Sequence, residues 1–171
     1  MNQQPECLKS FKEIQLPISS KDFFFFAIPD SVKAPYGEAF DEQLFSTHLY
    51  KPLPAQNPFN NRNCEVYPFG YTKKDPWFIA FVIYTVKEPG YIEPQVKAYI
   101  LDELCNKKDS LTIHNRYVWD GSERTNFEMS SRGLISITTE TNVLEDENKI
   151  ISKVGTKHYI INIREGKFVL Q

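Results

Sequence analysis

The feature that most constrains this chain is a series of short apolar segments that runs from residue 64 to the C-terminus. The segments lie at residues 64–71, 77–86, 95–101, 110–119, 125–130, 133–141, 149–163 and 167–170. Within them apolar and polar side chains alternate, which is typical of strands with one buried face. The connections are rich in Gly, Pro, Asn and Asp, and they are shorter than the dozen or so residues that a parallel crossover needs. The pattern therefore predicts a strongly twisted antiparallel meander of six to eight strands.

Segment 77–86 differs from the others because it is apolar at odd and even positions alike. A strand that is apolar on both sides is expected near the centre of a sheet, where both faces are covered. We therefore expect its residues to be among the most buried of the chain, namely Phe78, Ile79, Phe81, Val82 and Ile83.

The first 63 residues follow a different pattern, because prolines recur along them and block long regular elements. We expect a helical turn or two within 8–14, a buried strand at 23–28 and a loop at 51–63. Phe40, Leu44 and His48 lie four residues apart and favour an amphipathic helix over 38–50. The fold class predicted is α+β, mainly β, as one domain over 1–171, with an irregular N-terminal layer of short helical segments covering one face of the sheet.

Charge and hydropathy disfavour two classes of partner. The net charge is -2, and Lys and Arg are scattered rather than gathered into a stripe, so no nucleic-acid partner is expected. The longest apolar run, 77–86, is half of the ~20 residues that a membrane-spanning helix needs, so no transmembrane segment is expected. The first residues have neither a basic region nor an apolar region, and we expect no export signal in them.

Motifs that carry chemistry are missing from the sequence. There is no HExxH, paired CxxC, calcium-binding loop, GxSxG elbow or glycine-rich phosphate loop. His114 and His158 are expected on outward strand faces, and His48 on the helical stripe. The sequence thus predicts no catalytic residue, no metal ligand and no cofactor, and we expect a protein that is not an enzyme.

The three cysteines, Cys7, Cys64 and Cys105, are widely separated. Their odd number and spacing favour free thiols, and the alternative is a Cys64–Cys105 disulfide in an exported protein.

Two clusters are candidates for ligand binding. Tyr67, Phe69 and Tyr71 form an aromatic run broken by Pro and Gly, which either presents rings to a partner or packs at a sheet edge. A hairpin tip contributes the other candidate residues, namely Trp119, Asp120 and Arg124. The alternative for this tip is a surface ion pair between Arg124 and Asp120 or Glu123, which stabilises little.

Several segments in order along the chain resemble a group of uncharacterised secreted, lipoprotein-type proteins of the Bacteroidetes. They are Phe-Lys-Glu-Ile-Gln-Leu-Pro-Ile (11–18), Ile-Pro-Asp-Ser-Val (28–32), the segment 77–84, Tyr-Ile-Leu-Asp (99–102), Asp-Ser-Leu-Thr-Ile (109–113) and Tyr-Ile-Ile-Asn-Ile-Arg-Glu-Gly-Lys-Phe-Val (159–169). The resemblance implies a β-rich protein of the cell envelope or periplasm, and it implies no reaction and no cofactor. The chain departs from the group at its start, where Cys7 does not fit a lipobox.

These observations together favour a non-catalytic binding or structural module of the cell envelope, which engages a protein or a glycan through exposed aromatic residues. One alternative is an immunity protein that binds and neutralises a toxin. The other is a small hydrolase-like enzyme, which requires at least two titratable side chains to converge in one cleft. The candidates are His48, His114, His158, Asp102, Asp120 and Glu123.

Overall fold

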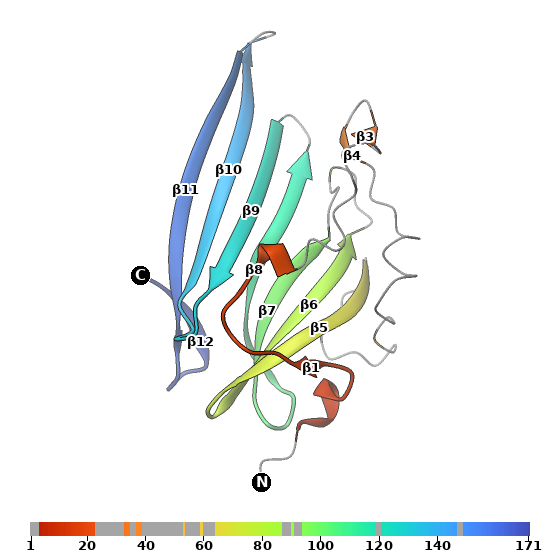
Figure 1. Cartoon of the computed structure of the whole chain (residues 1–171), viewed down its shortest axis with the longest axis vertical. Coiled ribbons are helices and arrows are strands. Elements are labelled where there is room, and N and C mark those ends of the chain that lie inside the picture. Colours follow the sequence, from red (N-terminus) through yellow and green to blue (C-terminus); the bar gives the residue numbers. More distant parts are fainter. Residues whose placement is uncertain are drawn as a thin grey trace.

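The computed structural model describes residues 4–22, 33–34, 37–38, 53, 59, 64–86, 90, 94–118, 121–146 and 149–171. Eight successive strands form an antiparallel meander in which each strand pairs with the next (Figure 1). They are β5 (Cys64–Lys74), β6 (Trp77–Val86), β7 (Gln95–Leu101), β8 (Lys107–Val118), β9 (Gly121–Met129), β10 (Ile135–Asp146), β11 (Lys149–Asn162) and β12 (Lys167–Leu170). The predicted twisted antiparallel sheet is confirmed, and the predicted ranges 77–86, 95–101 and 167–170 agree with β6, β7 and β12.

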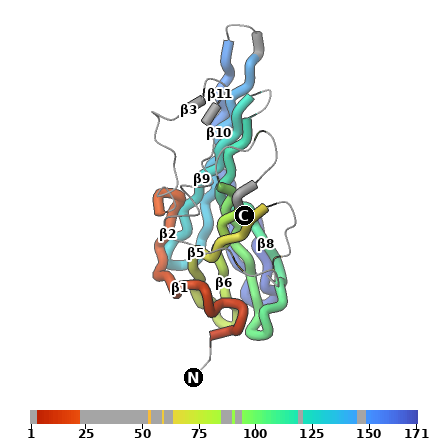
Figure 2. The backbone as a smooth tube through the Cα atoms, turned by 90° about the vertical axis from the view of Figure 1, so that its right-hand side faces the viewer, coloured from red at the N-terminus to blue at the C-terminus, as the bar shows by residue number. Residues whose placement is uncertain are grey.

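Two short N-terminal strands extend this sheet. β1 (Lys12–Glu13) pairs with β5 in parallel, and β2 (Ile18–Ser19) pairs with β9. Figure 2 shows this N-terminal segment running along the meander. A separate two-stranded ribbon joins β3 (Lys33–Ala34) to β4 (Gly37–Glu38).

The expected covering of helical segments is not found in the part of the chain that the structure describes. In place of a helix within 8–14 there is one 3₁₀ turn, η1 (Glu6–Leu8), and then β1. Ile14 donates a backbone hydrogen bond to the Tyr71 carbonyl, 2.8 Å away, so pairing with the sheet prevails over the local helical spacing. The strand expected at 23–28 and most of the helix expected over 38–50, with His48, lie outside the described residues. No helix within the described residues is long and apolar enough to cross a membrane.

The sheet curves so strongly that its two halves pack on each other. Phe81 and Ile83 of β6 share one core cluster with Phe127 of β9 and Ile137 of β10. The C-terminal strand β12 also contacts β8, because the backbone N–H of Phe168 donates a hydrogen bond to Asp109 Oδ2 over 2.8 Å. The opposite face of β5–β7 is covered by η1 and by Phe59, which form a second cluster with Val82 and Tyr84. β6 is therefore buried on both faces, and the five residues expected to be most buried are confirmed, all at or below 5% exposure.

A β-bulge in β5 reverses which face its side chains occupy. Pro68 pairs with Val82 and Gly70 with Phe81, so Phe69 is the extra residue. A Cβ at Gly70 would lie 2.7 Å from Ile14 Cγ2 and 3.0 Å from the Lys12 carbonyl, so β1 can approach only because this position is glycine.

A second bulge overturns the outward placement of His114. The register between β7 and β8 shifts between Val96 and Lys97, so that Ile113 is the extra residue and His114 lies opposite Val96. His114 is 6% exposed. The alternation of polar and apolar residues fails here because a bulge adds one residue to the period of two. His158, by contrast, is exposed as predicted.

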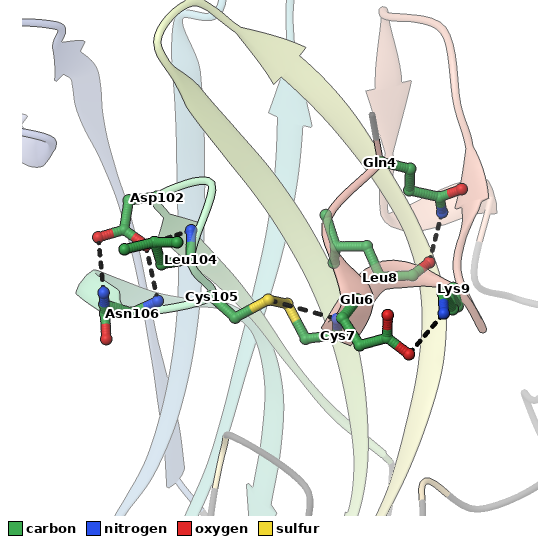
Figure 3. Close-up of a disulfide and its surroundings, with 9 residues drawn as sticks. All are labelled: Gln4, Glu6, Cys7, Leu8, Lys9, Asp102, Leu104, Cys105 and Asn106. Atoms are coloured by element: carbon green, nitrogen blue, oxygen red, sulfur yellow. Dashed lines mark hydrogen bonds and ion pairs between the residues drawn. A yellow bond between two sulfur atoms is a disulfide. The ribbon is translucent and has the colours of Figure 1, made fainter. Parts of the chain in front are cut away.

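The cysteine prediction is wrong for Cys7 and Cys105, which were expected as thiols, and the alternative pairing of Cys105 with Cys64 is wrong as well. A disulfide joins Cys7 of η1 to Cys105 in the turn between β7 and β8, with Cα atoms 6.1 Å apart (Figure 3). Cys64 is not part of a disulfide and keeps its thiol. Sequence spacing does not reveal this pair, because the partners are 98 residues apart and meet only when the N-terminal segment packs on the outer face of the sheet.

The turn that carries Cys105 is organised by Asp102. Its Oδ1 accepts hydrogen bonds from the backbone N–H groups of Leu104 and Asn106, at 2.9 and 2.8 Å (Figure 3). Its Oδ2 lies 3.0 Å from Lys108 Nζ. Burial of the carboxyl raises its pKa, but the hydrogen bonds from Asn106, Lys108 and Leu104 outweigh burial and lower the pKa of Asp102 to about 2. The ionised carboxylate thus holds the turn in the shape that presents Cys105 to Cys7.

We expect Asp102→Ala to lower the free energy of unfolding by about 1 kcal/mol at neutral pH, because the turn loses its acceptor. The folded-state pKa lies below the usual value of 3.8, so the contribution is present above about pH 4 and is lost as the pH falls through about 2. Urea unfolding of both proteins at neutral pH and near pH 2 measures this, and Asp102→Asn, which keeps one acceptor oxygen, is the control. A deficit of the same size at both pH values would contradict the assignment.

Candidate functional site

A polar face runs across β2, β9, β10 and β11. On these strands one set of alternate residues points to the core, including Phe127, Met129, Ile135 and Ile137, and the other set points away from it. The strand register aligns the outward set into two cross-strand rows. One row consists of Ser19, Glu128, Ser136 and His158, and the next of Asn126, Thr138 and Thr156.

The segment after β2 turns this flat face into a pocket of about 520 Å³. Ser20 fixes the segment, because its hydroxyl is buried and accepts a hydrogen bond from the Phe127 backbone N–H at 2.8 Å. The pocket is lined by Ser19, Ser20, Lys21, Arg124, Asn126, Phe127, Glu128, Ser136, Thr138 and Thr156. A neighbouring hollow of about 400 Å³ shares Ser19, Glu128 and Ser136 and continues the groove towards Leu134.

Hydroxyl and amide side chains belong to six of the ten residues that line the pocket. Thr138 Oγ1 and Thr156 Oγ1 lie 3.1 Å apart, so the two hydroxyls form a hydrogen-bonded pair across the strands. Asn126 Oδ1 is buried and accepts no hydrogen bond within the described part of the chain. Side-chain hydroxyls both donate and accept, so this wall can satisfy a ligand that carries many groups of either kind.

Formal charge at the pocket is mixed. Lys21 and Arg124 contribute two positive groups and Glu128 one negative group. Strand pairing also places Glu140 opposite Arg124 on the same face. A wall with both signs of charge close together suits an uncharged or weakly charged polar ligand better than a polyanion.

The site residues predicted from sequence are not brought together. Tyr67 is fully buried and Tyr71 is 7% exposed, on opposite faces of β5, while Phe69 is half-buried against the core. These rings pack within the fold and offer little surface to a partner, and at Tyr71 strand β5 is paired on both sides, with β1 and β6. Trp119 and Asp120 lie outside the described residues. Of the predicted site residues that the structure describes, Arg124 is the one that lines the pocket.

The four titratable candidates that the structure describes are spread over the fold, and His48 and Asp120 lie outside the described residues. His114 is buried opposite Val96, Asp102 lies in the turn between β7 and β8, and Glu123 points to the opposite face of β9 from the pocket. His158 Nδ1 lies 2.9 Å from Ser136 Oγ. No carboxylate among the described residues hydrogen-bonds to this imidazole, so the pair lacks the group that orients the base in a catalytic triad.

Metal ligands do not gather either, since no three His, Cys, Asp or Glu side chains of the described residues lie close enough to hold an ion. No protein-family model, curated protein or solved structure matches the chain. The pocket residues were missed from sequence because serines and threonines at alternate strand positions are also typical of any solvated sheet face. The available signal is the alternation of Ser136, Thr138 and Glu140 with Ile135 and Ile137.

Proposed function

We propose that this protein is a non-catalytic binding module whose ligand is a glycan held in the groove across β2, β9, β10 and β11. The observation that supports this is the pocket wall, in which hydroxyl and amide groups from four strands converge on about 520 Å³. Sites for small ligands commonly enclose about 300–1,000 Å³. Sugars present dense arrays of hydroxyl groups, which need donors and acceptors at close spacing.

The strands supply the rigidity that such a site needs. Cross-strand neighbours on one face have Cβ atoms about 5 Å apart. Their polar groups therefore lie at fixed, regular positions, where they can hydrogen-bond to successive hydroxyls of a sugar. Each hydrogen bond contributes about 0.5–1.5 kcal/mol, because the same groups are hydrated in the free protein. We therefore expect modest affinity and a preference for oligosaccharides that contact both rows. The envelope location implied by the resemblance would place the protein among such glycans.

Thr138→Val is expected to weaken glycan binding about three- to tenfold, because it replaces a hydroxyl of the wall with a methyl group of similar size. Calorimetric titration with soluble oligomers of glucose, N-acetylglucosamine and glucuronic acid measures the effect and identifies the sugar class. Thr139→Val is a matched control: Thr139 is the next residue of β10, is also half-buried, and points to the opposite face.

Two results would contradict the proposal. One is the absence of heat from every oligomer at millimolar concentration. The other is an equal loss of affinity in Thr138→Val and Thr139→Val, which would show that binding does not depend on this face of β10.

A further inference from the structure

Among the residues that the structure describes, no strand pairs with the outer edge of β11 over most of its length. β12 pairs with β11 only from Tyr159 to Asn162. Between Lys149 and His158 no strand of the described residues pairs with β11 on the side away from β10. In Figure 1 the β10–β11 hairpin extends beyond the ends of the neighbouring strands, so this edge faces outward.

The direction of the free hydrogen-bonding groups follows from one contact. Gln171 N donates to the His158 carbonyl over 2.9 Å, so the peptide groups of His158 point to the β12 side. Peptide groups of alternate residues point the same way along a strand, and the register of β11 with β10 is continuous from Lys149 to Tyr159 on the β11 side. Ser152, Val154 and Thr156 therefore present their N–H and C=O groups to the open edge.

The side chains of this edge are sorted by chemistry. Lys149, Lys153 and Lys157 occupy every fourth position and are all exposed, on the face opposite to the pocket. The other face carries two apolar side chains, Ile150 at 67% exposure and Val154 at 69%. Lysines on an unpaired edge commonly prevent it from pairing with other strands. Because their charge is positive, they repel a basic strand and attract an acidic one.

The same edge of a second copy offers no carboxylate to these lysines, because residues 149–158 contain three lysines and no Asp or Glu. Antiparallel pairing of the whole segment about a two-fold axis at Lys153 would set Lys149 opposite Lys157 and Lys153 opposite itself. Like charges directly opposite each other destabilise a sheet. An extended segment with carboxylates four residues apart places opposite charges at the same positions.

We propose that the open edge of β11 binds an extended acidic segment of another protein, which adds a strand to the sheet. The carboxylates of that segment would face Lys149, Lys153 and Lys157. These are non-hydrogen-bonded positions of the new strand pair, where side chains approach most closely. Apolar residues of the partner would cover Ile150 and Val154, and its backbone would pair with the groups of Ser152, Val154 and Thr156.

The test uses two labelled nonapeptides and fluorescence anisotropy. The acidic peptide has glutamate at its first, middle and last positions, valine opposite Ile150 and Val154, and threonine elsewhere. The basic peptide has lysine in place of each glutamate. We expect the full-length protein to bind the acidic peptide, to bind the basic peptide at least about tenfold more weakly, and to lose the difference at high salt.

Two sets of variants separate backbone pairing from charge. Val154→Pro removes an N–H that faces the edge while leaving the β10 ladder intact, and we expect about tenfold weaker binding than in Val154→Thr, which keeps the N–H. Lys153→Glu combined with Lys157→Glu is expected to reverse the preference, so that the basic peptide binds better. Lys12→Glu, an exposed charge reversal on β1, is expected to leave the preference unchanged.

Three results would overturn the proposal. They are equal binding of the two peptides, no effect of either the proline or the double charge reversal, and a protein that elutes as a dimer which Val154→Pro dissociates. The last would assign the edge to a second copy. The two proposals can fail separately, because their test residues differ. Thr138 lies on β10 and not at the edge, and Lys153 and Lys157 lie on the face opposite to the pocket.

Discussion

Phe81→Ala is expected to lower the free energy of unfolding by about 3–5 kcal/mol, the largest effect of any single substitution considered for this chain. Phe81 is fully buried at the centre of β6. Its cross-strand neighbours are Gly70 on β5 and Ala98 on β7. These residues are too small to fill the space that the ring would leave, so the cavity would persist. Equilibrium unfolding in urea measures the loss.

Leu104→Ala is the control for this substitution, because it also removes an apolar side chain but from a position that is 77% exposed. We expect a change of no more than about 0.5 kcal/mol there. A loss below about 1 kcal/mol for Phe81→Ala would contradict the central position of β6 in the core.

Removal of the Cys7–Cys105 disulfide, as Cys7→Ser with Cys105→Ser, is expected to lower the free energy of unfolding by about 2–5 kcal/mol. The bridge closes a loop between residues 98 apart, and long loops restrict the unfolded chain most. It also holds η1 against the outer face of β5–β7, where Leu8 is fully buried. Urea unfolding of the unsubstituted protein and of the double variant, each with and without reductant, measures the total loss.

Thiol labelling checks the pairing directly. Under denaturing, non-reducing conditions a maleimide is expected to label one cysteine, Cys64, and after reduction to label all three. Cys64→Ser is the control, and it is expected to leave the effect of reductant on stability unchanged. Three labelled cysteines before reduction would contradict the bridge.

The local sequence is sufficient to predict the strands from β5 to β12, because alternation and turn residues act between near neighbours. The range of β6 and the burial of Phe81 follow from one short segment of sequence. Alternation fails at Phe69 and Ile113, where bulges insert one residue. A bulge depends on how two strands twist against each other, so it cannot be predicted from the sequence of either strand alone.

The candidate site was largely invisible in the sequence for a related reason. Tyr67 and Tyr71 were predicted as ligand-binding residues because they are aromatic, but both rings are buried and pack within the fold. The pocket residues are ordinary serines and threonines, and they form a wall only because cross-strand register aligns them and Ser20 anchors the segment after β2. Register is set by the whole pairing of strands and not by any one residue.

The sequence by itself determined the order and the approximate bounds of the meander strands and, away from the bulges of β5 and β8, their buried faces, because hydrophobic alternation and turn chemistry are local properties of the chain. Tertiary structure alone decided the Cys7–Cys105 bridge, the packing of the two sheet halves, the polar pocket and the open edge of β11. Each of these features depends on which residues that are distant in sequence come into contact and which do not. Their proximity depends on the twist and curvature of the completed sheet, which accumulate over many strands.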